Sequence, residues 1–247
     1  VVDGLGGDDV PGLDAVSFQL AGGEILGVAG IAGNGQNALL AAMTGEAPAQ
    51  RSETILFDGQ PVGRLGPEAR RAMGLRGVPE ERNGHAAVGA LSLTENALLT
   101  GRGRFAARGV VDFAEAARFA GEVIARFKVK ATGATARAGG LSGGNLQRFV
   151  VGREILSQPK ALVIDQPTWG VDAGAAAAIH QALLDLAADG AAILLISQDL
   201  DELLALCHRL AVIQGGRLSA AFDNDAAAKG KIGLLMGDAG PEQADAA

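Results

Sequence analysis

Short apolar runs recur along the chain, and each ends at a glycine-rich turn or at a polar residue. Residues 24–30, 161–164 and 192–196 are such runs, and their length and composition predict buried strands. The second run ends directly at Asp165, which places a carboxylate at the tip of a strand. The pattern therefore predicts a sheet whose strands carry polar residues at their ends.

Helical patterns alternate with these strands. A short helix is predicted over residues 37–43, stopped by Gly45, and an alanine-rich helix over residues 173–188 ends at Gly190. Residues 111–127 predict an amphipathic helix, with its apolar side chains near one face: Phe119, Val123, Ile124 and Phe127. Strands that alternate with helices predict an α/β fold.

Turn signals complete the organisation. Residues 52–64 predict a β-hairpin around the turn Asp58-Gly59, and residues 210–221 predict a terminal β-ribbon around a Gly-Gly turn. We expect one domain over residues 1–222, with a helical subdomain inserted at about residues 82–140. Residues 223–247 are expected to form a peripheral helix and a frayed tail.

Composition narrows the class of protein. Of the 247 residues, 48% are hydrophobic and 4% aromatic, and no apolar run reaches the roughly 18 residues that a membrane span needs. The net charge of −7 and the absence of a basic block argue against nucleic acid as a partner. A single cysteine, Cys207, excludes an internal disulfide, and the three histidines lack ligand spacing. The chain begins Val1-Val2, and we expect it to be part of a longer polypeptide.

The segment GIAGNGQN, residues 30–37, has the glycine frame of a phosphate-binding loop, G-x-x-x-x-G-K-[ST]. Gln36 stands where a lysine would meet phosphate, and Asn37 stands where a hydroxyl would bind Mg²⁺. A neutral amide in place of an ammonium is expected to weaken nucleotide binding by roughly tenfold or more. A plain structural turn is the alternative interpretation. The expected nucleotide-binding residues are Gly30, Gly33, Asn34, Gly35, Gln36 and Asn37.

Two further strand ends carry candidate chemistry. Asp165 is placed to hold Mg²⁺ or a metal-bound water, and a helix cap or a buried ion pair is the alternative. The next residue, Gln166, can orient an attacking water but cannot accept its proton. Gln198 follows another buried strand, where it could donate to a phosphate oxygen without the switchable charge of histidine. The helix after it is expected to begin with a capping box at residues 199–202.

The pentapeptide LSGGN presents a serine hydroxyl and bare backbone N–H groups at the start of a predicted amphipathic helix that runs to about Ser157. A helix N-terminus carries partial positive charge, so this segment suits the terminal phosphate of a nucleotide. The apolar residues on one side of that helix are Leu146, Phe149 and Val150. The residues of this signature segment are Leu141, Ser142, Gly143, Gly144 and Asn145.

Three further residues each allow a structural and a functional interpretation. Glu80 either senses nucleotide or belongs to a solvated charged turn, PEER. Asp172 is expected to cap the alanine-rich helix, with a second role at a dimer interface compatible with this. Trp169, the only tryptophan, is either an interface anchor or a packed loop aromatic.

The ordered set GIAGNGQN, PEER, LSGGN, VIDQPTWGVD and SQDLDE resembles the nucleotide-binding domain of ATP-binding-cassette transporters. It is most similar to the second half of the tandem ATPase subunits that serve simple-sugar and nucleoside importers. The resemblance implies a RecA-like P-loop NTPase core with an antiparallel β layer and an inserted helical subdomain. ATP and Mg²⁺ are the implied cofactors.

The resemblance also implies roles for single residues. Two cassettes would close head to tail, with each ATP between one cassette's glycine loop and the other's LSGGN. Asp165, Gln166 and Gln198 would occupy the catalytic positions of the chain's own site, with Asp165 and Asn37 as weak Mg²⁺ ligands. Glu80 would lie in the loop facing the membrane partner. An aromatic residue for stacking adenine is missing near the start of the chain.

The departures from the family pattern fall on the chain's own site, whereas LSGGN is intact. We therefore expect a degenerate, non-hydrolysing cassette that completes the ATPase site of a partner cassette, in the N-terminal half of the same polypeptide. Transmembrane permease subunits would be its other partners, at the cytoplasmic face of the inner membrane. The alternatives are a non-enzymatic scaffold cassette and, less favoured, a soluble cassette ATPase of DNA repair or translation.

Overall fold

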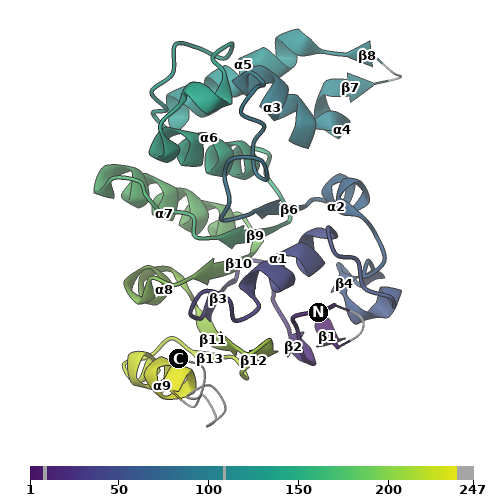
Figure 1. Cartoon of the computed structure of the whole chain (residues 1–247), viewed down its shortest axis with the longest axis vertical. Coiled ribbons are helices and arrows are strands. Elements are labelled where there is room, and N and C mark those ends of the chain that lie inside the picture. The colour runs from purple at the N-terminus through teal and green to yellow at the C-terminus, as the bar shows by residue number, and fades with distance from the viewer. Residues whose placement is uncertain (8–9, 108–109, 238–247) are drawn as a thin grey trace, which may run out of the picture.

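A central sheet organises the molecule, whose computed structural model describes residues 1–7, 10–107 and 110–237. In the described part the sheet has seven strands in the order β12-β11-β3-β10-β9-β6, and β13 pairs with β11 (Figure 1). The neighbours from β11 to β6 are all parallel. The strands are β3 (Ile25–Ala29), β6 (Leu75–Val78), β9 (Ala161–Asp165), β10 (Ala192–Ser197), β11 (Arg209–Gln214), β12 (Arg217–Leu218) and β13 (Phe222–Asp223).

The apolar runs form strands because both faces of the sheet are covered. In β10, Ile193 and Leu195 pack into one hydrophobic cluster, whereas Leu194 and Ile196 pack into the other. Side chains alternate between the two faces of a strand, so a strand buried on both faces has apolar residues at consecutive positions. The three predicted core strands are confirmed in β3, β9 and β10.

Helices cover the sheet on both sides. Helix α1 (Gln36–Thr44) contributes Leu39 and Leu40 to the cluster on one face. Helices α6 (Gly143–Leu156), α7 (Ala173–Ala188) and α8 (Leu200–Leu206) contribute to the cluster on the other face. Helix α9 (Ala228–Gly237) lies beside β11 and α8 (Figure 1), and residues 238–247 of the predicted tail lie outside the described residues.

The range 82–140 holds α3 (Leu93–Thr100), α4 (Arg102–Phe105) and α5 (Phe113–Arg126), which gather beyond one end of the sheet (Figure 1). The amphipathic face of α5 is confirmed, with Phe119 and Val123 buried. The helix begins two residues later than predicted, because the two residues before its Asp112 cap form β8 (Val110–Val111). This strand pairs with β7 (Ala106–Ala107), a hairpin that the sequence pattern did not predict.

An antiparallel layer flanks the sheet. Strand β1 (Val2–Leu5) pairs with β2 (Val16–Phe18), and β4 (Leu56–Phe57) pairs with β5 (Gln60–Pro61) around the predicted Asp58-Gly59 turn. A 3₁₀ turn, η1 (Ser52–Thr54), precedes β4, and α2 (Pro67–Met73) follows β5. A second 3₁₀ turn, η2 (Ala138–Gly140), leads into the signature segment. The predicted ribbon is confirmed in β11 and β12, although its second strand ends at Leu218. The division at residue 222 and the subdomain limits stay predictions.

Two local predictions are wrong. Helix α6 is not amphipathic, because Gln147, Arg153 and Glu154 are buried together with its apolar residues. Only one of the two hydrogen bonds that define a capping box is present at α8. The Asp199 side chain accepts from the N–H groups of Asp201 and Glu202, but the backbone N–H of Asp199 donates to a serine hydroxyl and not to Glu202. Tertiary hydrogen bonds hold these polar side chains inside the protein, and a helical pattern does not reveal such bonds.

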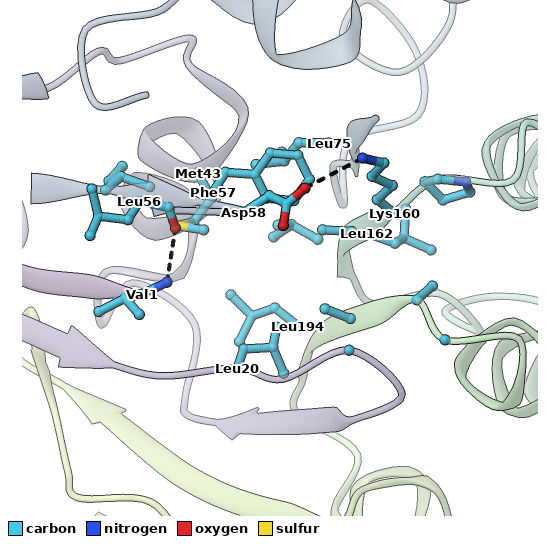
Figure 2. A pocket seen from close by; sticks show the side chains of 18 of the residues that line it. Val1, Leu20, Met43, Leu56, Phe57, Asp58, Leu75, Lys160, Leu162 and Leu194 are labelled. Atoms are coloured by element: carbon cyan, nitrogen blue, oxygen red, sulfur yellow. Dashed lines mark hydrogen bonds and ion pairs between the residues drawn. The ribbon is translucent and has the colours of Figure 1, made fainter. Parts of the chain in front are cut away.

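A cavity of about 880 Å³ lies between the antiparallel layer and the amino ends of the sheet strands. Figure 2 shows Leu20, Leu162 and Leu194 lining it, with the ion pair of Lys160 and Asp58 at its side. Ligands of α/β sheets bind at the opposite, carboxyl ends of the strands. Within the described ranges, no helix has both the length and the apolar character of a membrane span.

Candidate functional site

A second cavity, of about 310 Å³, lies at the carboxyl ends of β3, β9 and β10. It brings together the glycine loop and the ends of β9 and β10, each of which lies more than a hundred residues after the loop in sequence. Its lining includes Gly30, Gly33, Gly35, Gln36, Asn37, Glu80, Asp165, Gln166, Ser197 and Gln198. None of its described lining residues is aromatic.

The glycine loop turns from β3 into α1 through left-handed backbone. Gly33 has φ 88° and Gly35 has φ 110°, conformations that an L side chain adopts only with strain. Asn34 does not line the cavity, because its side chain donates to Ile31 O and accepts from the backbone N–H of Gly215. The loop is therefore tied to the turn that follows β11.

The side chain of Gln36 lies inside the glycine loop and is 7% exposed. Its Oε1 accepts from the backbone N–H of Asn34 at 3.0 Å, and its Nε2 donates to Ile31 O at 2.8 Å. Phosphate-binding loops hold anions on backbone N–H groups of this kind. Gln36 therefore occupies a donor that a phosphate would need, whereas Asn37 stays exposed at the cavity.

Asp165 ends β9 with its side chain at the cavity and is 2% exposed. Burial, reinforced by the negative charge of Glu80, raises its pKa from 3.8 to about 7. Near neutral pH the carboxyl group is therefore protonated in a large fraction of molecules. The neighbouring Glu80 is exposed and lines the same cavity, so its charge acts on the cavity.

Gln166 and Gln198 line the same cavity as Asp165. Gln166 is buried and has φ 51°, a left-handed conformation that is uncommon outside glycine. Its N–H donates to Ile196 O, which fixes the loop after β9 against β10. Gln198 is exposed at the cavity. Both amides can donate to or orient an oxygen ligand, and neither can take a proton from water.

Sequence reasoning missed Glu202, which lies on α8 behind this wall with a side chain 2% exposed. Its carboxylate accepts from Thr168 Oγ1 at 2.6 Å, from Ser197 Oγ at 2.7 Å and from His180 Nε2 at 2.9 Å. It thereby joins the loop after β9 to the last residue of β10. In the sequence its only signal was a helix-capping pattern, which indicates a solvated end rather than a buried acceptor.

The signature segment lies outside the cavity, at the start of α6. Ser142 is exposed, and its side chain accepts no hydrogen bond from the N–H groups in the first turn of the helix. These N–H groups therefore remain uncapped by Ser142. Asn145 Nδ2 donates to Ser142 Oγ at 2.8 Å, and Asn145 Oδ1 accepts from Lys130 N–H at 2.8 Å. Leu141 packs against the core cluster. The contacts of Asn145 and Leu141 therefore hold the segment in place.

Asp172 and Trp169 belong to a loop beside the signature segment. Asp172 caps α7, as predicted, by accepting from the N–H of Ala175 at 3.0 Å, and it forms an ion pair with Arg148. Trp169 is 64% exposed, so the interpretation as a packed loop aromatic is wrong. Its carbonyl oxygen accepts from Arg82. The interface role of both residues stays a prediction.

The histidines do not form a metal centre. Among the described residues, no group of three or more His, Cys, Asp or Glu side chains could hold a metal ion. Instead, His85 pairs with Glu46, His180 with Glu202, and His208 accepts from the backbone N–H of Ile25.

Comparison with known proteins identifies the family. Residues 13–169 match the model of the ABC transporter family. The xylose import ATP-binding protein XylG of Ralstonia nicotianae is 36% identical over 220 residues, covering 89% of this chain and 43% of that protein. The guanosine import ATP-binding protein NupO of Bacillus subtilis is 35% identical over 250 residues, covering 99% of this chain and 48% of that protein. The chain thus spans less than half the length of these curated relatives.

Solved structures show the same fold. A dimeric ATP-binding cassette in a post-hydrolysis state, bound to ADP and Pi, superimposes with a TM-score of 0.74 at 20% identity. The match covers 91% of this chain and 96% of that cassette, which shows the RecA-like P-loop fold expected from the sequence. The chain belongs to the ABC transporter family, as an ATP-binding domain homologous to sugar and nucleoside import ATPases.

Proposed function

We propose that this domain couples ATP to the import of nucleosides or simple sugars as the non-hydrolysing member of a pair of cassettes. Its Leu141–Asn145 segment contacts the ATP held by the partner cassette and completes that ATPase site. Its own cavity binds nucleotide weakly. The partner cassette belongs to the other part of the same polypeptide, and permease subunits carry the solute across the membrane.

The observation that carries this proposal is the position of Gln36. A lysine there would add a positive charge for the phosphates, whereas the amide of Gln36 turns back and satisfies the loop's own Asn34 N–H and Ile31 carbonyl. A phosphate that enters the loop competes with Gln36 Oε1 for the Asn34 N–H and gains no ion pair in return. Weak binding at this site follows from both effects.

The second support is Gln166 at the position after the strand carboxylate. Hydrolysis needs a group that accepts a proton from the attacking water, which contributes roughly 10²- to 10⁴-fold to rate. An amide lacks this basicity. The described cavity lining includes two carboxyl side chains, Asp165 and Glu80, and Asp165 is the one that ends a core strand.

The cavity residues fit Mg²⁺ only in part. Asp165 and Asn37 offer oxygen ligands, and the nearby Glu80 carboxylate adds negative charge that a divalent cation would neutralise. The ion, when bound, supplies charge neutralisation for the phosphates. An amide at residue 37 is a neutral ligand, which is consistent with weak Mg²⁺ binding at this site.

The substrate class rests on the relatives, whose names specify xylose and guanosine import. Peripheral attachment to the cytoplasmic face of the inner membrane, through permease subunits, fits a domain of this family. The acidic chain, with a net charge of −7, is unsuited to binding nucleic acid by phosphate contacts.

The test is an ATPase measurement with and without a partner. We expect the purified domain to show negligible turnover and the assembly with its partner cassette to be active. Ser142→Arg in the assembly should abolish turnover, because a bulky side chain blocks the exposed helix start. Gln60→Arg, at an exposed position of β5, is the control and should leave turnover unchanged. Robust turnover by the domain alone would refute the proposal.

The closed state of the glycine loop also favours a second candidate, a scaffold cassette that no longer uses nucleotide. The two candidates differ at Leu141–Asn145. If Ser142→Arg leaves ATP-driven closure and turnover of the assembly unchanged, the scaffold function is the correct one. If turnover is lost, the segment serves the partner's ATP.

A further inference from the structure

The loop from Gln166 to Asp172 is fastened to the beginning of α6 at two points. Gln147 Nε2 donates to Gln166 O at 3.2 Å and to Pro167 O at 3.0 Å. Arg148 pairs with the carboxylate of Asp172 at the other end of the loop. Neighbouring residues of one helix thus hold both ends of the loop.

The middle of the loop lies against the signature segment itself. A Cβ added at Gly144 would lie 3.0 Å from Gly170 O, and one added at Gly143 would lie 3.0 Å from Arg82 Nη1. The same Arg82 donates to Trp169 O. Gly144 thus lies directly against the loop, and the Arg82 side chain bridges Gly143 and the loop, so a shift of the first turn of α6 must move the loop.

Gln147 is fully buried, and its Oε1 has no hydrogen-bond partner. Burying an unsatisfied carbonyl oxygen costs free energy that an apolar side chain of the same length would not cost. Packing alone therefore gives no reason for an amide at this position. What the amide adds is the pair of hydrogen bonds to the loop.

The loop end that Gln147 holds is part of the cavity wall. Gln166 lines the cavity, has left-handed backbone, and donates from its N–H to Ile196 O of β10. Its carbonyl oxygen is the atom that Gln147 contacts. One backbone carbonyl thus connects the wall of the chain's own cavity with the helix that carries Ser142 to Asn145.

We propose that Gln147 is a positioning residue that couples the chain's own nucleotide cavity to its signature segment. It fixes the Gln166–Asp172 loop on α6, so the cavity wall and the surface offered to the partner's ATP move as one body. The consequence for turnover rests on the proposed function, because it assumes that the signature segment serves a partner site. The positional coupling itself does not depend on that assumption.

The experiment compares Gln147→Met, which keeps the side-chain length and removes the donor, with the unmodified chain. Amide hydrogen exchange is measured for residues 142–147 and 166–172, and Trp169, the only tryptophan, reports loop mobility through fluorescence anisotropy. We expect about tenfold faster exchange in both segments and lower anisotropy. The thermal midpoint should change little, because removal of the unsatisfied oxygen offsets the loss of the two hydrogen bonds to the loop.

Gln181→Met is the matched control, since Gln181 is exposed on α7 and bonds only its neighbour Asp185 among the described contacts. Gln147→Asn is the second variant: it keeps the amide but is one methylene too short to reach, and it should loosen both segments as well. Loosening of residues 166–172 without residues 142–147, or of neither, would overturn the proposal. A uniform rise in exchange with a lower midpoint would show a general packing role and would also overturn it.

The effect on function is measured as ATP turnover by the assembly with the partner cassette. Gln147→Met should lower kcat about tenfold and leave KM for ATP within about twofold, because the signature segment is displaced rather than removed. An unchanged kcat despite loosened segments would refute coupling to turnover. An assembly that is inactive even with unmodified Gln147 would refute the proposed function instead, and the exchange data would still decide the positional coupling.

Discussion

The side-chain Oε1 of Gln36 accepts a hydrogen bond from the backbone N–H of Asn34, 3.0 Å away, inside the loop that should hold phosphate. Gln36→Lys is expected to open this contact and to supply a cation. ATP affinity of the domain should rise by roughly tenfold or more, since hydrogen bonds to charged groups contribute about 1.5–3 kcal/mol. Isothermal titration with ATP measures the change.

The control is Gln60→Lys, an exposed position on β5 that makes the same change in net charge away from the cavity. Its ATP affinity should equal that of the unmodified domain. If both variants bind ATP equally tightly, the gain comes from net charge and the closed-loop explanation fails.

Asp165 makes the stability of the domain depend on pH. Its pKa is raised from 3.8 to about 7, so the folded state binds the proton more tightly than the unfolded state. The stabilisation is therefore complete below about pH 4 and is lost as pH rises through about 7. Asp165→Asn should raise the free energy of unfolding at pH 8 by an amount on the order of 4 kcal/mol at most.

Denaturant titration in the absence of divalent cations, at pH 5 and pH 8, checks this. The difference between Asp165→Asn and the unmodified domain should be clearly larger at pH 8. An equal difference at both pH values would mean that the carboxyl group is ionised throughout. Glu80→Gln, which removes the neighbouring charge, should shift the transition to lower pH.

Glu154 is a fully buried carboxylate on α6, bonded to Arg153 Nε at 2.7 Å and to Arg76 Nη1 at 3.3 Å. Burial raises its pKa, but the surrounding arginines outweigh burial and hold the pKa below its usual value. Glu154→Gln leaves two guanidinium groups without their counter-charge. We expect a loss of about 3–5 kcal/mol in unfolding free energy. The exposed Glu122→Gln on α5 should cost almost nothing.

Glu202 supports the cavity wall from behind through three donors. Glu202→Gln replaces an acceptor oxygen by an NH₂ group, so at least one of these hydrogen bonds must be lost. A cost of about 1.5–3 kcal/mol is expected, since each bond is made to a charged acceptor. Chemical denaturation measures it, and a stability unchanged within error would show that the network rearranges without loss.

The sequence allowed the strands, the glycine loop and the cap at Asp172 to be predicted because each depends on neighbours in sequence. Alternating burial of β10 residues produces an apolar run, and a glycine frame produces a left-handed turn. The hairpin of β7 and β8 escaped prediction because it has only two residues in each strand. Such a short element has no readable periodicity.

The side-chain hydrogen bonds of the site could not be predicted from the sequence. Gln36 was recognised as a missing lysine, but its return to Asn34 N–H is a matter of side-chain conformation. Gln147 and Glu202 contact residues 19 and 34 positions away, respectively. The sequence pattern predicts only a helix around the first and a helix cap around the second. Their partners come together only when β9, β10 and the helices have packed. Long-range polar contacts of this kind leave no local pattern.

The Lys160–Asp58 ion pair beside the 880 Å³ cavity marks a position for attaching a chemical label. It lies at the amino ends of the strands, so the five residues of β9, at about 3.3 Å each, separate it from Asp165. Cys207 is buried, and burial raises the pKa of its thiol, so a maleimide would react first with a cysteine introduced by Asp58→Cys. A dye or a surface tether attached there would leave the phosphate side of the sheet open for binding measurements.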